Sequence, residues 1–203
     1  MLLFDGMGGE KYGEMAAYLA AKTFDTIYPE RKKKLMKQFL SEVCEKMNSE
    51  ICAFVEVNKI SQMGTTVAII AFDKKEVFIC NVGDSKIFQH SAGKLLQISL
   101  DHVVPTYDDN KPQLTQNLGI SKTEFVIEPY IAKGEYTDGD RYLLCSDGLT
   151  DMVTVEAIEK TLNEQKSISC CANELMQQAL ANGGVDNITI ILCRIKKKRW
   201  IFK

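Results

Sequence analysis

Residues 64–82 read GTTVAIIAFDKKEVFICNV, two apolar runs rich in β-branched residues on either side of the polar turn DKK. Such runs are typical of β-strands, and the short break between them predicts a hairpin of two antiparallel strands. We expect a meandering antiparallel sheet over this part of the chain. Similar short runs, each a predicted strand, occupy residues 1–4, 85–90, 94–98, 125–131, 141–145 and 187–195.

Apolar residues at helical spacing surround these strands on both sides. They recur from Glu14 to Ile27 and again from Arg31 to about Val57, with Pro29 between the two predicted helices. Residues 155–162 and 167–181 show the same periodicity. Helices, then strands, then helices and a closing strand predict a layered domain of the α+β class.

The composition is that of an ordinary globular domain, with 203 residues of which 45% are hydrophobic and 26% charged. We expect one domain over residues 1–195, followed by a basic tail at 196–203. The net charge of −2 argues against a nucleic-acid binder, and no apolar run approaches the length of a membrane span. Seven cysteines without a CxxC pair, and no signal peptide, favour reduced thiols in a cytoplasmic protein.

Four aspartates fall at the edges of predicted strands. Asp5, Asp84 and Asp147 follow a strand, and Asp186 precedes the last one. Carboxylates gathered at a sheet edge repel one another unless cations neutralise them, and aspartate oxygens are ligands that Mg²⁺ and Mn²⁺ prefer. A single Asp-Gly pair is better interpreted as a turn, which is our interpretation of Asp138-Gly139. The order and context of the other aspartates favour a metal site.

A series of short motifs runs through the chain. It begins with Asp5-Gly6-Met7-Gly8-Gly9, followed by Gly13-Glu14. The other motifs are, in order, Gly64-Thr65-Thr66, Asn81-Val82-Gly83-Asp84-Ser85, Asp101-His102, Leu114-Thr115-Gln116-Asn117-Leu118-Gly119, Leu144-Cys145-Ser146-Asp147-Gly148-Leu149 and Asp186-Asn187-Ile188-Thr189. In these motifs and their order, the chain resembles the bacterial branch of the type 2C (PPM) metal-dependent serine/threonine protein phosphatases. The first motif is similar to the opening signature of that family, and the resemblance extends to about residue 195.

The resemblance implies two antiparallel β-sheets packed as a sandwich and flanked by α-helices. It also implies two or three Mn²⁺ or Mg²⁺ ions. Asp5 would bridge the first two ions, the Gly6 carbonyl would be a ligand of one, and Asp147 and Asp186 would hold the other. These three aspartates are the candidate catalytic residues.

A third and weaker metal site would use Asp84 and Asp151. The implied activity is hydrolysis of phosphoserine and phosphothreonine in proteins by a metal-activated water, without a covalent phosphoenzyme. The implied partners are a phosphoprotein substrate and a serine/threonine kinase that the enzyme opposes, or that kinase's targets. We expect a monomer that binds no nucleic acid and does not span a membrane.

The sequence departs from the family pattern in several places. The family usually begins with strands that carry an Arg-x-x-Asn-Glu-Asp-like motif, whose arginine grips phosphate and one of whose acids helps to hold a metal. No such motif occurs in this sequence. Its loss would remove a bidentate phosphate clamp. The alternative is therefore a weak or inactive pseudophosphatase that acts as a binding or regulatory domain, and a metal-free regulator is a third possibility. Met7, Lys86 and Asn117 also stand where relatives have a histidine and two arginines.

Other phosphatase and hydrolase chemistries fit less well. Cys193 and Arg199 match the Cys-x5-Arg spacing of cysteine phosphatases, but no glycine-rich cradle lies between them, so we interpret the match as coincidence. With only His90 and His102 in the chain, a histidine-based metallohydrolase is disfavoured. We expect His102 to be a hydrogen-bonding loop residue.

Overall fold

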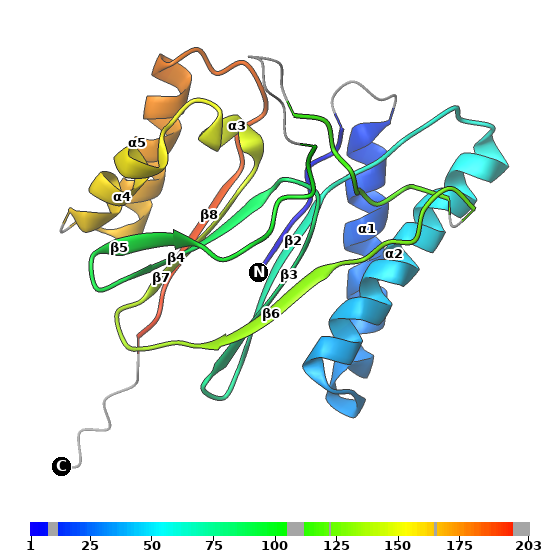
Figure 1. Cartoon of the computed structure of the whole chain (residues 1–203), viewed down its shortest axis with the longest axis horizontal. Helices are drawn as coiled ribbons and strands as arrows, with labels where there is room; N and C mark the ends of the chain where they lie inside the picture. Colours follow the sequence, from blue (N-terminus) through cyan, green and yellow to red (C-terminus); the bar gives the residue numbers. More distant parts are fainter. Residues whose placement is uncertain (8–11, 105–111, 122, 165, 197–203) are drawn as a thin grey trace.

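A computed structural model of the chain describes residues 1–7, 12–104, 112–121, 123–164 and 166–196. They form four layers, with two β-sheets in the middle and helices on both outer faces (Figure 1). The predicted α+β sandwich is therefore confirmed. In chain order the elements are β1 (Leu2–Leu3), α1 (Gly13–Ile27), the 3₁₀ helix η1 (Tyr28–Lys33), α2 (Met36–Asn58), β2 (Val67–Asp73), β3 (Glu76–Val82), β4 (Lys86–Ser91), β5 (Lys94–Gln97), β6 (Tyr130–Glu135), β7 (Arg141–Cys145), α3 (Asp147–Thr150), α4 (Val155–Asn163), α5 (Ile168–Ala181) and β8 (Ile190–Arg194).

Two antiparallel sheets of four strands lie within the described residues. Their strand orders are β1-β2-β3-β6 and β5-β4-β7-β8. The chain leaves the first sheet after β3 and enters the second at β4, so residues 83–85 form a crossover between the sheets. The expectation of one meander was wrong at this point. The hairpins β2-β3 and β4-β5 look alike in sequence, and the sequence pattern alone does not show that they belong to different sheets.

The alternation of side chains along each strand explains the layers. On β2, Val67 and Ile69 pack with α1 and α2, whereas Ala68 and Ile70 face the second sheet. On β7, Leu143 packs towards α4 and α5 while its neighbours face the first sheet. Both faces of these strands are buried, which is why they read as continuous apolar runs. The layer between the sheets consists of Leu3, Ala68, Ile70, Val77, Ile79, Ile87, Tyr142 and Leu144.

Two predicted elements are shifted in the structure. The second helix was expected from Arg31, but Arg31 lies in η1, which has Pro29 in its first turn. The extended backbone of Leu35 separates η1 from α2. The strand expected at 125–131 lies at Tyr130–Glu135 instead. Its position is set by pairing with β3 and not by hydrophobicity, since its second half is polar and exposed.

The remaining composition-based expectations concern thiols and membranes. All seven cysteines lie in the described residues, and none of them forms a disulfide. The sulfurs of Cys44 and Cys80 are in contact at 3.5 Å in the core. Among helices of the described residues, none combines the length and the hydropathy that a membrane span requires. Of the predicted basic tail, only Lys196 belongs to the described part of the chain.

Candidate metal centre

The aspartates from the strand edges meet at one pocket of about 160 Å³. Asp5 follows β1, Asp84 lies in the crossover, Asp147 begins α3, and Asp186 precedes β8. The pocket thus draws carboxylates from both sheets. Its remaining lining is the Gly6 backbone with Met7, Thr66, Pro112 and Leu114.

Hydrogen bonds from the two residues that precede β2 fix the position of Asp5. The Asp5 carbonyl accepts from the Thr66 N–H and the Thr65 hydroxyl, both at 2.9 Å, and the Asp5 N–H donates to Thr66 Oγ1 at 3.2 Å. The next residue has no room for a side chain, because a Cβ on Gly6 would lie 2.2 Å from the Gly13 carbonyl oxygen. The first turn of α1 therefore packs directly on the backbone that follows Asp5.

Two close contacts join the segments that carry Asp147 and Asp186. The Ser146 hydroxyl donates to the Asn187 carbonyl at 3.1 Å. A Cβ on Gly148 would lie 2.3 Å from the same carbonyl oxygen, so glycine is what lets the two segments touch. The Asn187 N–H also donates to Asp186 Oδ1 at 2.7 Å, which orients that carboxylate.

The crossover places Asp84 by a sharp turn at Gly83. Gly83 has φ +100°, and a Cβ there would lie 2.7 Å from a Thr66 methyl carbon. Ser85, on the other side of Asp84, shares a 2.7 Å hydrogen bond with the Thr66 hydroxyl. Thr66 thus contacts both Asp5 and the crossover.

His102 holds the same turn by two hydrogen bonds. Its ring Nδ1 accepts from the Gly83 N–H at 3.2 Å, and its backbone N–H donates to the Gly83 carbonyl at 3.0 Å. Burial lowers the pKa of His102, which favours the neutral ring that an acceptor at Nδ1 requires. The prediction of a hydrogen-bonding loop residue is confirmed.

The donor set fits hard divalent cations. Asp147 is only 8% exposed, and a buried carboxylate is costly unless opposite charge or hydrogen bonds compensate it. Within the described residues, however, no three acidic, histidine or cysteine side chains converge closely enough to enclose a single ion. Mg²⁺ and similar ions usually take one or two carboxylates and keep several waters. Aspartates spread around the pocket wall therefore fit more than one partly hydrated ion.

Sequence reasoning and structure differ at the edge of this site. Asp151, proposed for a third metal, is exposed directly after α3, four residues after Asp147, and is not among the described residues that line the pocket. Thr66 and Leu114 do line it, although sequence reasoning gave them no role. Both belong to motifs quoted above, so their place in the family pattern was the available signal.

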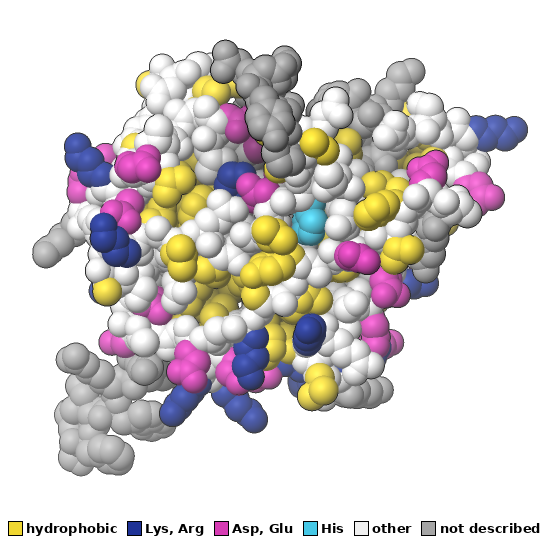
Figure 2. Space-filling model, viewed as in Figure 1, with side chains coloured by type: hydrophobic (Ala, Val, Ile, Leu, Met, Phe, Trp, Pro, Cys, Tyr) yellow, Lys and Arg dark blue, Asp and Glu magenta, His cyan; other side chains and the backbone are white. Residues whose placement is uncertain are grey.

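A larger groove on the molecule carries no such chemistry. It measures about 360 Å³ and lies between β5 and β6, lined by residues such as Val77, Ile79, Leu96 and Tyr130. Figure 2 shows hydrophobic side chains gathered on this face. Among the residues that the structure describes, no carboxylate lines the groove. The smaller pocket is the candidate site because four aspartates line it.

Cys193 does not have the properties of a phosphatase nucleophile. It lies half-buried on β8, and burial raises the pKa of its thiol, whereas a nucleophilic cysteine needs a lowered pKa. Arg199, its formal partner in the Cys-x5-Arg spacing, lies outside the described residues.

Comparison with known proteins decides the family. A family model described as protein phosphatase 2C matches residues 1–182. The chain belongs to this family. Serine/threonine protein phosphatase PstP of Mycobacterium tuberculosis is 30% identical in an alignment of 207 positions, which covers 96% of this chain and 40% of that protein. The chain thus spans less than half of PstP. A second 2C-type relative, serine/threonine phosphatase stp of Listeria welshimeri, is 30% identical over 95% of this chain and 82% of its own length.

Solved structures of relatives show the same 2C fold. The crystal structure of Mycobacterium tuberculosis PstP/Ppp superposes with a TM-score of 0.85 at 29% identity, covering 97% of this chain and 88% of that one. The catalytic domain of PstP in complex with two manganese ions gives 0.83 at 29% identity, covering 97% and 87%. Stp1 of Staphylococcus aureus gives 0.86 at 27% identity, covering 97% and 83%.

Proposed function

We propose that this chain is a Mn²⁺- or Mg²⁺-dependent protein phosphatase that hydrolyses phosphoserine and phosphothreonine. The main support for this proposal is that four aspartates from segments far apart in the chain line one pocket: Asp5, Asp84, Asp147 and Asp186. The two manganese ions in the PstP catalytic domain support the choice of metal.

Each pocket residue has a task in this proposal. Asp5, Asp147 and Asp186 hold two cations, with the Gly6 carbonyl as a further oxygen ligand. Asp84 belongs to a third, weaker site. When bound, the ions neutralise phosphoryl oxygens and acidify a water for in-line attack on phosphorus. In physiological terms, we propose a cytoplasmic, monomeric enzyme with one catalytic domain over 1–195, opposing a serine/threonine kinase.

The test compares phosphopeptide hydrolysis by the chain and two variants. With Mn²⁺ the chain should release phosphate from phosphothreonine and phosphoserine peptides and prefer them to a phosphotyrosine peptide. Asp147→Asn should lose this turnover, whereas Asp138→Asn, a matched change in an exposed turn outside the pocket, should keep it. Absence of turnover with every peptide, in a folded protein with Mn²⁺, would contradict the proposal and favour a binding domain.

A further inference from the structure

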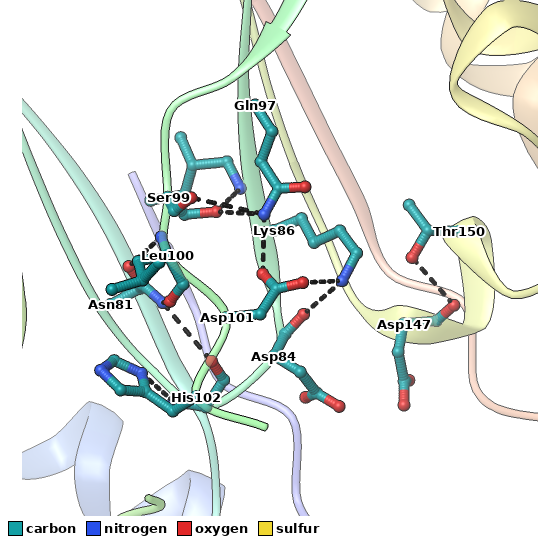
Figure 3. A network of polar contacts seen from close by, with 12 residues as sticks. Asn81, Asp84, Lys86, Gln97, Ser99, Leu100, Asp101, His102, Asp147 and Thr150 are labelled. Atoms are coloured by element: carbon teal, nitrogen blue, oxygen red, sulfur yellow. Dashed lines mark hydrogen bonds and ion pairs between the residues drawn. The ribbon is translucent and has the colours of Figure 1, made fainter. Parts of the chain in front are cut away.

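One surface segment braces the crossover that carries Asp84. This segment, residues 97–102, follows β5 and is here called the brace. It contacts residues on both sides of Asp84, namely Asn81 and Gly83 before it and Lys86 after it (Figure 3). Leu100 exchanges two hydrogen bonds with the Asn81 side chain, at 2.6 and 3.2 Å. His102 exchanges two with Gly83, as described above.

The contact nearest the metal pocket is made by Lys86. Its ammonium donates to the Asp84 carbonyl at 3.3 Å and pairs with Asp101 Oδ2 at 2.5 Å. Gln97 donates to the other oxygen of Asp101 at 2.7 Å, so both carboxylate oxygens are engaged. Figure 3 shows this ammonium on the backbone side of Asp84, while the side chains of Asp84 and Asp147 point together to the other side.

This ion pair differs from an ordinary surface pair. The side chains of Lys86 and Asp101 are 19% and 24% exposed, so water screens them less than it screens a fully exposed pair. Removing one partner would leave the other charge largely buried beside the crossover without its opposite charge. Lys86 also donates to the main-chain carbonyl of Asp84, so the position of the ion pair affects the position of Asp84.

We propose that Lys86 and Asp101 are positioning residues for cation binding at Asp84, and this inference rests on the function proposed above. Neither side chain is needed as a metal ligand. The ammonium fixes the Asp84 carbonyl, the aspartate fixes the ammonium, and the carboxylate of Asp84 consequently faces the pocket. Outer partners of this kind often determine how well a metal ligand performs.

Coulomb attraction and the proposed positioning role predict opposite changes in Mn²⁺ affinity when Lys86 is replaced. Lys86→Met removes a positive charge near a pocket of aspartates, and by Coulomb attraction alone Mn²⁺ should then bind more tightly. If Lys86 positions Asp84, the same substitution should weaken Mn²⁺ binding. Lys86→Arg keeps the charge and the donors and should retain most of the affinity.

The experiment measures Mn²⁺ dissociation constants by isothermal titration calorimetry, with thermal unfolding of the metal-free protein as a folding check. Lys86→Met should weaken the Asp84-dependent binding step about tenfold, the low end of what loss of an outer partner costs. Lys94→Met is the matched control, because Lys94 is 83% exposed and pairs with Glu159, away from the crossover. It should bind as the unmodified chain does.

The possible outcomes separate this inference from the proposed function. If the unmodified chain binds no Mn²⁺, the metal-dependent function itself fails. If it binds Mn²⁺ and Lys86→Met binds equally or more tightly, only the positioning role is wrong. Should Lys86→Met not fold, Gln97→Leu tests the same chain of contacts without removing a charge. Weakened Mn²⁺ binding in that variant supports the proposal, and unchanged binding overturns it.

Discussion

Replacing Gly148 by alanine tests how the two halves of the metal pocket are joined. Gly148 lies in α3, where alanine has the better helix propensity by about 1 kcal/mol, so local structure alone predicts stabilisation. The tertiary contact predicts the reverse. The new Cβ would lie 2.3 Å from the Asn187 carbonyl oxygen, and contacts under 3.0 Å essentially never occur. The two segments must therefore separate by at least 0.7 Å, the difference between those distances.

The size of the effect follows from what the separation disturbs. Overpacking of this kind costs about 1–3 kcal/mol. The Ser146 hydroxyl donates to the Asn187 carbonyl, and loss of this bond costs about 1 kcal/mol more. After subtracting the propensity gain, the free energy of unfolding should fall by about 1–3 kcal/mol. For a domain of this size each kcal/mol lowers Tm by about 2–4 °C, so we expect a fall of about 5 °C.

Differential scanning calorimetry of the metal-free protein measures this fall. Gly134→Ala is the matched control, because the nearest atom to its new Cβ is a Val77 methyl at 3.7 Å. It should leave Tm unchanged. Gly148→Ala should also weaken Mn²⁺ binding, since Asp147 and Asp186 move apart. A Gly148→Ala protein that is as stable as the control, or more stable, would refute this reasoning.

Three further predictions test the packing and the titration of other residues. Burial lowers the pKa of His102, so the neutral ring should contribute its full share of the unfolding free energy above about pH 6.5. This contribution should be lost as the pH falls through the folded-state pKa. Urea unfolding at several pH values measures the dependence, which His102→Asn should flatten. Phe39→Ala should cost about 3–5 kcal/mol of unfolding free energy because Phe39 is 2% exposed, whereas Leu35→Ala, at a residue 79% exposed, should cost under about 0.5 kcal/mol. A thiol reagent should label exposed Cys170 in the native protein but should react with Cys80 only after unfolding. The contact with Cys44 and burial raise the pKa of Cys80 and so reduce its reactivity. Labelling of Cys80 in the native protein would show that this core opens.

The sequence predicted best those strands that are buried on both faces. Glu76–Val82 and Arg141–Cys145 were expected with the bounds that the structure shows, because their apolar residues pack into the hydrophobic cores on both faces of the strands. The same property hid the sheet assignment. Strands buried on both faces carry no polar side that would indicate which sheet they join, and the crossover at Gly83 was therefore missed.

Edge positions and tertiary contacts were the harder part of the prediction. Strand β6 is held by backbone pairing with β3, and its exposed residues gave no periodic signal. At the site, the aspartates stood out because each borders a strand and their order resembles a known family. The roles of Thr66 and Lys86 depend on residues distant in sequence, which no local pattern reveals. The proposed roles of the individual ligands remain predictions.

The most direct test of the central claim is the Mn²⁺ dependence of p-nitrophenyl phosphate hydrolysis by the chain and by Asp147→Asn. This small ester needs no protein-substrate contacts, so its turnover reports on the aspartate pocket alone. We predict turnover that rises with Mn²⁺, disappears with a chelator, and is lost in Asp147→Asn although that variant remains folded. Equal turnover without metal, or in Asp147→Asn, would contradict the assignment of this pocket as the metal centre.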